Sequence, residues 1–390
     1  MPKLRFPGFE GEWENTELGN LAFYGKEKTR VRKNHFVSTE NIEQNFGGIV
    51  PFEDSETMVD GTGFTKGDIL IANIRPYLKK IWQSDMDGAC NADVLVMKPQ
   101  EIDNVFFYFL VAQNKFIDYV MGGVKGSKMP RGDKAHILQY NTAIPSILEQ
   151  QQIAKFLSLL SNRIAAQKEL IETLKKYKRG LLSSMFPEKG EAIPKHRFSG
   201  FTEPWEQRKL GKIAGNVIGG GTPKTSVAEY WDGSIPWIQS SNVQENEMFE
   251  FEIPKSITQL GLDKSAAKLI PQNSIAIVTH VGVGKLVFVP FPYATSQDFT
   301  SLAELKTDAK FTCYSLYRRI QNDLHIVQGS AIKGITKEDL LTKEIMVPEI
   351  EEQKKIGEYF RRFDRLITLH QCKLDISVKI KSGLLQQLFI

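Results

Sequence analysis

The sequence predicts an α+β chain in which two globular domains of similar framework are joined by two long antiparallel coiled-coil helices. A pseudo-two-fold internal repeat relates the two halves. Three observations support this prediction: the halves of the 390-residue chain begin and end alike, each half closes with a heptad pattern, and each middle contains β-rich runs. At roughly 100–200 residues per domain, the length also fits two domains or a little more.

The beginnings of the two halves repeat without a gap. Pro-Lys-Leu-Arg-Phe-Pro-Gly-Phe at residues 2–9 recurs as Pro-Lys-His-Arg-Phe-Ser-Gly-Phe at residues 194–201. Further on, Trp13 aligns with Trp205, and a Leu-Gly pair follows each Trp. A repeat of this length indicates that the chain is built from two similar units.

The ends of the halves match as well. Pro-x-Ile-x-Glu-Gln at 145–150 recurs at 348–353, and Lys-x-Gly-Leu-Leu follows later in both halves. Residues 23–125 and 215–328, between these ends, look unrelated. A duplicated enzyme is expected to keep its chemistry in both halves, whereas a duplicated reader of two ligands keeps its framework and varies its reading surface. The pattern favours a reader, and free drift of the two middles is the alternative.

Each half ends in a heptad seam, in which apolar residues alternate at spacings of four and three. The first seam predicts a helix from 146 to 183, about 57 Å long. Polar residues interrupt the two seams at equivalent positions, Gln167 with His370 and Lys178 with Lys381. The predicted seam residues are Ile153, Leu157, Leu160, Ile164, Ile171, Leu174, Ile356, Phe360, Phe363, Ile367 and Leu374.

Two such helices in one chain most simply pack on each other, antiparallel, with one globular domain at each end. Packing of each helix on its own domain is the alternative. The short polar segment 187–193 is a credible boundary between the halves. The predicted divisions are a first domain at 1–144, a first helix at 145–186, the linker, a second domain at 194–346 and a second helix at 347–390.

The divergent middles carry clusters that suit nucleic acid. Lys and Arg can hold phosphates or bridge guanine edges, while amide and hydroxyl groups can discriminate bases. A solvated surface or a tight turn is the alternative for each cluster. The candidate DNA-binding residues are Lys26, Lys28, Arg30, Arg32, Arg75, Lys79, Lys128, Arg131, Gly221, Thr222, Lys224, Thr225, Gln239, Ser241, Asn242, Lys285 and Lys333.

Composition narrows the class of protein. The net charge is +4, which permits phosphate binding without demanding it. The three cysteines are far apart, so they predict neither a metal site nor a disulfide framework. No apolar run is long enough to span a bilayer, and the first residues do not resemble a signal peptide, so we expect a cytoplasmic protein with no membrane association.

Three segments of the chain invite comparison with catalytic motifs. Gly282-Val283-Gly284-Lys285 resembles the end of a phosphate-binding loop but lacks its first glycine and its final Ser or Thr. Asp298, Glu304 and Lys306 resemble a nuclease set, which predicts magnesium-dependent cutting that Lys306→Ala abolishes. No tetrapeptide typical of an amino-methyltransferase is present, and no Ser/His/Asp set can be assembled. We therefore expect no catalytic site, with a nuclease or a protein-binding scaffold as alternatives.

Taken together, these motifs resemble the specificity (S) subunit of Type I restriction–modification systems. The resemblance rests on the Pro-x-Ile-x-Glu-Gln-x-x-Ile starts of both helices, their Gly-Leu-Leu ends and the Arg-Phe-x-Gly-Phe…Trp-Glu…Leu-Gly start of each half. Gly-Gly-Thr-Pro at 220–223 and Ile-Pro-Trp-Ile at 235–238 fit too. The resemblance covers essentially the whole chain.

The resemblance implies two target-recognition domains that each read one part of a split, asymmetric double-stranded DNA site. It also implies helices that space these domains and dock two methylation (M) subunits, with restriction (R) subunits in the full complex. Cofactors are expected only in the partners, namely S-adenosylmethionine, ATP and Mg²⁺. The first half has Gly25-Lys26-Glu27-Lys28 near the place of the Gly-Gly-Thr-Pro loop, so the two half-sites are expected to differ.

Overall fold

The chain is described by a computed structural model over residues 2–50, 52, 55–126, 128–245, 247–326 and 334–389. It divides into two compact units: unit 1 comprises residues 1–168 and 372–390, and unit 2 comprises residues 169–371. The division cuts both long helices, so each unit holds a part of each. Among the described residues, no helix combines the length and apolar character that crossing a bilayer requires.

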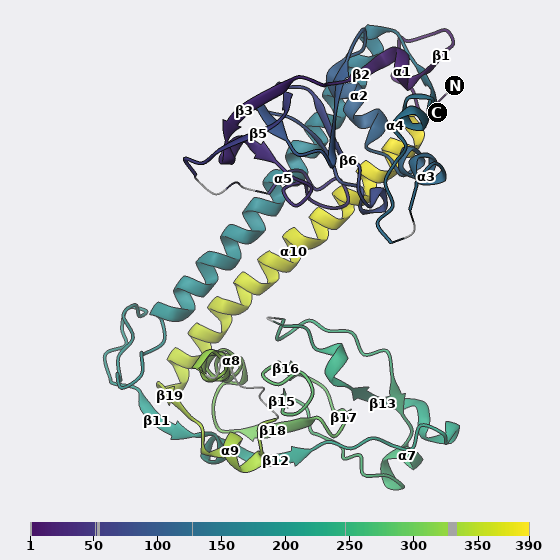
Figure 1. Ribbon diagram of the computed structural model, residues 1–390. Helices are drawn as coiled ribbons and strands as arrows, with labels where there is room; N and C mark the ends of the chain where they lie inside the picture. The colour runs from purple at the N-terminus through teal and green to yellow at the C-terminus, as the bar shows by residue number, and fades with distance from the viewer. Residues whose placement is uncertain are drawn as a thin grey trace. The chain divides into compact units, whose positions relative to one another are not determined.

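Unit 1 is built on three small sheets (Figure 1). Two strands pair in the first, four in the order β2-β9-β6-β7 form the second, and four in the order β3-β5-β8-β4 form the third. Within the third sheet β4 runs parallel to β8, and the other pairs are antiparallel. The strands are β1 (Glu14–Glu17), β2 (Ala22–Tyr24), β3 (Lys28–Arg32), β4 (Phe36–Val37), β5 (Met58–Phe64), β6 (Ile69–Ala72), β7 (Ile81–Gln83), β8 (Gly88–Cys90), β9 (Val94–Pro99) and β10 (Asn141–Ile144).

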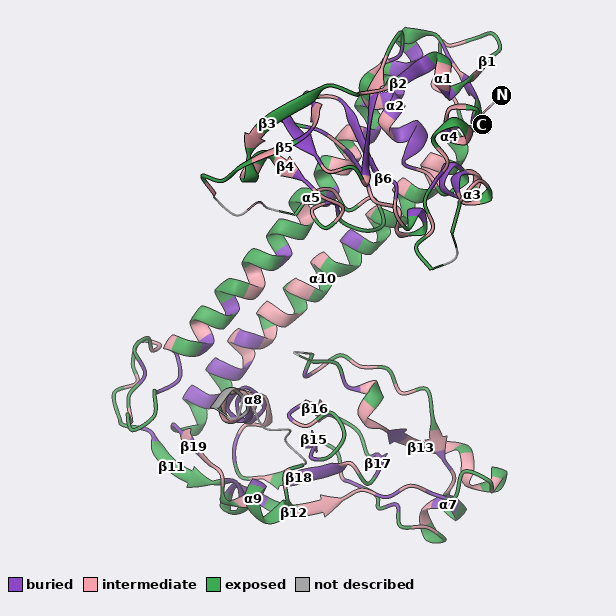
Figure 2. Cartoon of the chain, in the orientation of Figure 1, coloured by how far each residue is buried: buried purple, intermediate pink, exposed green. Residues whose placement is uncertain are grey.

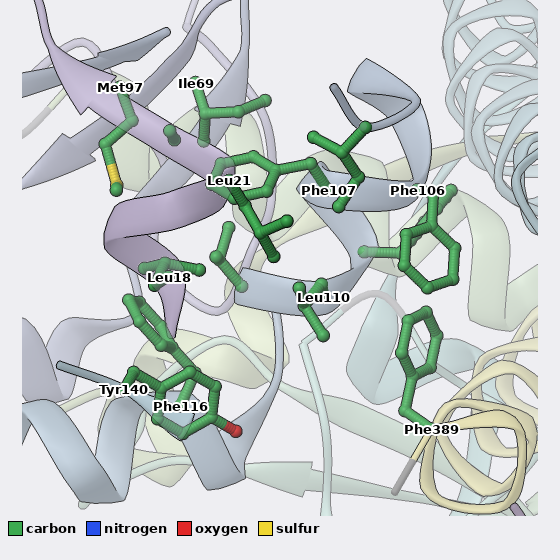
Figure 3. Packing of buried hydrophobic residues seen from close by; sticks show 14 of the residues in the cluster. Leu18, Leu21, Ile69, Met97, Phe106, Phe107, Leu110, Phe116, Tyr140 and Phe389 are labelled. Carbon is green, nitrogen blue, oxygen red and sulfur yellow. The ribbon is translucent and has the colours of Figure 1, made fainter. Parts of the chain in front are cut away.

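Burial follows sequence pattern in these strands. All four residues of β6 are apolar and buried, as expected for a strand covered on both faces, whereas β3 is polar and largely exposed at a sheet edge (Figure 2). Short helices pack on the second sheet and complete the main core (Figure 3). They are α1 (Leu18–Leu21), α2 (Asn104–Val111), α3 (Asn114–Gly122) and α4 (Lys134–Leu138).

Unit 2 repeats this plan. A two-stranded pair, a four-stranded antiparallel sheet in the order β12-β18-β15-β16 and a three-stranded sheet β14-β13-β17 make up its β structure. The strands are β11 (Glu206–Lys209), β12 (Ala214–Gly219), β13 (Trp231–Ile238), β14 (Ser256–Ile257), β15 (Ser274–Val278), β16 (Leu286–Val289), β17 (Ala294–Thr295), β18 (Phe299–Leu305) and β19 (Glu344–Val347). The helices are α6 (Leu210–Ile213), α7 (Gln259–Asp263), α8 (Ala309–Ile326) and α9 (Lys337–Thr342).

The two middles, which look unrelated in sequence, therefore share a topology. The order β2-β9-β6-β7 corresponds to β12-β18-β15-β16, and the parallel pair β4/β8 corresponds to β13/β17. The two units differ in the elements that are added to this shared topology. Unit 1 adds the exposed β3–β5 ribbon, and unit 2 adds α7 and β14.

Two helices far longer than the rest are shared between the units. Helix α5 covers Ile147–Ser184, within one residue of the helix 146–183 that the seam predicts, and α10 covers Ile350–Leu388. In unit 1 the start of α5 shares a core with the end of α10, and in unit 2 the end of α5 shares a core with the start of α10. Within each unit the helices therefore run antiparallel.

The repeated motifs are framework residues. The Gln150 side chain accepts from the Asp103 N–H at 2.9 Å and donates to the Pro145 carbonyl at 2.9 Å. Gln353 makes the same two bonds in unit 2, at 2.8 and 2.7 Å, to Asp308 and Pro348. Each Gln thereby fastens the start of a long helix to the N-terminus of another helix, which explains why both halves keep the motif.

A buried ion pair accompanies each of these glutamines. Arg5 donates to both carboxylate oxygens of Glu149 at 2.8 and 2.7 Å, and Arg197 does the same to Glu352. Charge-assisted bidentate pairs of this kind are strong and geometrically specific. They tie the opening segment of each half to the start of the long helix that closes it.

Candidate nucleic-acid interface

The first basic cluster lies on the edge strand β3. Lys28, Arg30 and Arg32 alternate along the strand, so their side chains share one face, and all three are exposed. The Lys28 ammonium donates to the Thr62 hydroxyl at 3.3 Å, and Arg32 has Glu56 at 3.6 Å in a well-exposed pair. The predicted residue Lys26 lies just before the strand, also exposed. This face can hold a row of phosphates.

A second cluster surrounds the turn between β6 and β7. Arg75 and Lys79 flank the single 3₁₀ turn Pro76–Leu78, and both have left-handed backbones, with φ of 51° and 57°. Asn45 and Phe46, also at positive φ, donate their N–H groups to the Leu78 and Lys79 carbonyls at 3.0 and 2.9 Å. Strained non-glycine residues tend to gather at functional sites. Four of the eight in the described part of the chain meet here.

The segment that carries Lys128 and Arg131 joins this turn. The Arg75 N–H donates to the Pro130 carbonyl at 2.8 Å, which places the two predicted segments side by side. Lys128 is exposed. Arg131 instead donates twice to one carboxylate oxygen of Asp93, at 3.2 and 3.0 Å, so its guanidinium is partly committed within the protein. The structure thus brings Arg75, Lys79, Lys128 and Arg131 into one surface.

In unit 2 the glycine-rich segment has a structural role that the sequence did not reveal. Gly221 is buried, its N–H donates to the Thr295 carbonyl, and its own carbonyl accepts from the Trp237 indole. A Cβ at Gly221 would lie 2.2 Å from the Ala266 carbonyl oxygen. Gly221 therefore permits a close approach to the protein's own backbone. The prediction that Gly221 contacts DNA is corrected accordingly: the residue packs inside unit 2.

The side chains that follow Gly221 differ in how far they are exposed for contact with a ligand. The Thr222 hydroxyl hydrogen-bonds the side-chain oxygen of Gln297, and Thr222 is half-buried. Lys224 and Thr225 are exposed, and the Lys224 carbonyl accepts from the Trp231 indole at 3.2 Å. This bond fixes the backbone of the segment while leaving the Lys224 ammonium in solvent.

Gln239, Ser241 and Asn242 form a capped turn at the end of β13. The Asn242 side-chain oxygen accepts from the Gln239 N–H at 2.9 Å, so Asn242 shapes the turn and keeps only its amide donors for a ligand. Unit 1 has the same device: Asn41 accepts from the Ser38 N–H at 2.8 Å. Ser241 is exposed. Part of the segment predicted to contact bases therefore serves a turn that both units contain.

Lys285 also has a counterpart. The Lys285 carbonyl accepts from the Val278 N–H, as the Lys80 carbonyl accepts from the Ala72 N–H. Each lysine therefore directly precedes the second strand of its hairpin, β16 in unit 2 and β7 in unit 1. The Lys80 ammonium donates to the Thr39 carbonyl at 2.6 Å. Lys285 is half-buried. The remaining prediction, Lys333, lies outside the described residues.

The structure separates the nuclease-like residues. Asp298 precedes β18 and Glu304 lies near its far end, six residues along, which is about 20 Å in an extended strand. Asp298 occupies the same place as Asp93 in unit 1. The main-chain carbonyl of Asp298 accepts from the N–H of Thr279, just after β15, and that of Asp93 accepts from the N–H of Asn73, just after β6. No group of three or more potential metal-binding side chains occurs among the described residues. Within the described residues, Asp298 and Glu304 therefore do not belong to one such group.

The seam residues lie inward on both long helices. Seven of the eleven are buried, and the remaining four, Leu160, Leu174, Phe363 and Ile367, are half-buried. In unit 2 the interruption Lys178 is buried and pairs with Asp364, which also accepts from the Tyr314 hydroxyl.

Unit 1 lacks this acid. Ser161 stands where the repeat places Asp364, and its hydroxyl donates to the Leu157 carbonyl. Lys381, the counterpart of Lys178, has its ammonium 5.4 Å from the centre of the Phe109 ring. Burial, together with the nearby charge of Lys168, lowers the pKa of Lys381. The polar interruptions are thus equivalent in sequence but not in environment.

Comparison with known proteins decides the family. The family model described as Type I restriction modification DNA specificity domain matches residues 10–176 and, separately, residues 202–379. The chain belongs to this family. The two matched stretches, one in each half, also confirm the internal repeat and the resemblance drawn from the motifs.

Three relatives illustrate the range of similarity. The MjaVIII specificity subunit of Methanocaldococcus jannaschii is 24% identical, in an alignment that covers 100% of this chain and 94% of the relative. The MjaIX specificity subunit of the same organism is 28% identical, over 48% of this chain and 44% of the relative. The EcoR124I/EcoR124II specificity subunit of Escherichia coli is 31% identical over 41% of each. The chain thus spans less than half the length of the last two.

Solved structures share the fold. The Type I S subunit from M. genitalium matches with a TM-score of 0.65 at 14% identity, over 100% of this chain and 99% of the other. A chain from a study of assembly and conformational transition in a type I R-M system matches with a TM-score of 0.59 at 18% identity, over 98% of each. The α+β class, the doubled framework and the two long antiparallel helices predicted from sequence are therefore confirmed.

Proposed function

We propose that this specificity subunit recognises a bipartite, asymmetric double-stranded DNA site and carries no catalytic site of its own. The observation that carries the proposal is the contrast between the two units. Their sheets and framework hydrogen bonds coincide, while the exposed residues on equivalent loops differ in type. Two surfaces of this kind on one scaffold suit two different half-sites.

The division of labour within each half-site follows from residue chemistry. Exposed cations, such as those of β3 and the Arg75–Lys79 turn, would fix the protein on phosphates. Polar side chains beside them, including Thr225, Gln239 and Ser241, would discriminate base edges in the major groove. Because Gly221 and Asn242 are used for folding, base discrimination in unit 2 would rest on their neighbours.

The long helices would act as a ruler and as the docking surface for partners. Exposed apolar side chains lie along them, and such side chains commonly mark protein contacts. They are Leu148, Leu159, Leu170, Leu369, Ile376 and Ile380. The proposal assigns two methylation subunits to this surface, with restriction subunits joining the full cytoplasmic complex. It places S-adenosylmethionine, ATP and Mg²⁺ in those partners, which would methylate adenine or cleave DNA.

Mapping of N6-methyladenine tests the proposal. The chain is co-expressed with its methylation subunit, assembly is verified by size-exclusion chromatography, and the host genome is sequenced for modified adenine. A single two-part motif with a fixed unread gap is expected. An assembled complex that adds no methylation would favour the scaffold alternative, in which the variable surfaces bind protein and affinity for DNA shows no steep salt dependence.

A further inference from the structure

The hairpin turns β6–β7 and β15–β16 occupy the same place in the two units. The first residue of each turn donates its N–H across to the neighbouring strand: Asn73 to the Asp93 carbonyl at 2.8 Å and Thr279 to the Asp298 carbonyl at 2.7 Å. The carbonyls of Asn73 and Thr279 accept from the segments that precede α4 and α9, from the N–H of Gly132 at 3.2 Å and of Ile335 at 2.8 Å. Each turn is therefore held at its base by the same pair of bonds.

Both turns carry a large exposed hydrophobic side chain at the tip. Tyr77 is 49% exposed, and Val281, at 71%, is the most exposed large hydrophobic residue in the described part of the chain. A single exposed apolar residue is ordinary on a protein surface. Its recurrence on equivalent turns, in middles whose sequences otherwise differ, points to a shared use.

The backbone of both turns is built to project these tips. In unit 1, Arg75 and Lys79 adopt left-handed conformations that are strained for non-glycine residues, whereas unit 2 uses Gly282 and Gly284, at φ of 86° and 97°. Cationic or polar side chains flank each tip: Arg75 and Lys79 beside Tyr77, and the exposed His280 beside Val281. An apolar tip beside cationic or polar side chains can enter the major groove, where apolar side chains contact thymine methyl groups.

We infer that the two turns are the base-contacting tips of the recognition units, and that Tyr77 and Val281 each contact the 5-methyl group of a thymine. The inference rests on the proposed function and adds to it a chemical rule for one base in each half-site. In the major groove the thymine methyl is the only apolar group on a base edge, and apolar side chains recognise it by direct contact. Any methylated adenine implies at least one paired thymine in its half-site.

Deoxyuridine substitution tests this contact, because it removes that methyl and nothing else. Each thymine of the mapped site is replaced in turn, and the dissociation constant of the assembled methyltransferase complex is measured by fluorescence anisotropy. In each half-site one replacement is expected to weaken binding about fourfold, the effect of losing one buried methyl contact.

The side-chain variants assign the contact. Val281→Ala should abolish the deoxyuridine effect in one half-site and leave it intact in the other, and Tyr77→Ala should do the reverse. Val281→Thr and Tyr77→Phe keep a methyl or the ring and should preserve the effect. Deoxyuridine effects that persist in both alanine variants, or no effect at any thymine, would overturn the inference. Failure of the unaltered complex to bind its unmodified site would instead refute the proposed function.

Discussion

Arg197 donates two hydrogen bonds of 2.7 Å to the two carboxylate oxygens of Glu352, whose side chain is fully buried. Removal of the cation would leave a buried carboxylate without its partner. Arg197→Met is therefore expected to destabilise unit 2 by about 3–5 kcal/mol. Urea unfolding followed by tryptophan fluorescence measures this. Arg208→Met, which breaks an exposed pair with Glu206, should cost under about 1 kcal/mol, and equal losses in both variants would contradict the assignment.

The two equivalent lysines of the helix seam predict opposite effects. Lys178→Met strands the Asp364 carboxylate and should cost about 3–5 kcal/mol, whereas Lys381→Met removes a cation without an acid at the position equivalent to Asp364 and should stabilise by about 1 kcal/mol. Thermal unfolding of the two variants, side by side, tests the pair. A loss of stability in Lys381→Met would show that its contact with the Phe109 ring outweighs its burial.

The same residue predicts a pH dependence. Because burial and the Lys168 charge lower the pKa of Lys381 in the folded state, the unfolded chain binds more protons between that lowered pKa and the ordinary value near 10.5. Stability should therefore rise with pH across this window on account of Lys381. The slope should be smaller in Lys381→Met, when unfolding midpoints are compared between pH 8 and 10. An unchanged slope would mean that Lys381 is charged alike in both states.

Phe389 and Phe186 predict damage to different units. Phe389 packs on Phe106 in unit 1, with ring centroids 5.1 Å apart, and Phe186 packs on Phe311 in unit 2 at 5.5 Å. Each Phe→Ala change should cost about 3–5 kcal/mol. Hydrogen exchange with mass spectrometry locates the loss. Phe389→Ala should expose β6 and β9, and Phe186→Ala should expose β15 and β18; the same pattern in both variants would contradict the separate cores.

The ruler hypothesis predicts how the site responds to longer helices. A seven-residue insertion in both α5 and α10 preserves the heptad register and adds about 10 Å, which corresponds to about three base pairs. The unread gap in the methylation motif should lengthen by that amount, with both half-sites unchanged. Adenine mapping reads this directly. An unaltered gap, from a complex that still assembles, would show that the helices do not set the spacing.

The sequence allowed the framework to be predicted because its residues serve the same contacts twice. Glu149, Gln150 and their counterparts need particular side chains, so the repeat is visible in letters. The middles are equally related in fold, but their shared bonds run mostly between backbone groups, as between Asn91 and Val37 or Ser296 and Ile238. Backbone bonds tolerate any side chain, so this relationship leaves no signal in one sequence.

The sequence says less about the candidate site, for three physical reasons. A glycine that permits close approach looks the same whether the neighbour is DNA or, as at Gly221, the protein's own chain. Left-handed backbones at Arg75 and Lys79 have no sequence signature, because tertiary contacts impose them. The exposed side chains of Tyr77 and Val281 could not be singled out from the sequence, because single hydrophobic residues in loops form no pattern.

The place of Phe389 in the core of unit 1 has a consequence for biosynthesis (Figure 3). Most of unit 1 leaves the ribosome first, yet its core closes only when the end of α10 has been made, after all of unit 2. At about 5–20 residues per second, translation of roughly 200 residues takes about 10–40 s. During that interval the nascent first unit exposes the surface that Phe389 will cover. Unit 2 has no such delay at its own equivalent position, because Phe186 is made before most of its core. The unit encoded first is thus the last to be completed.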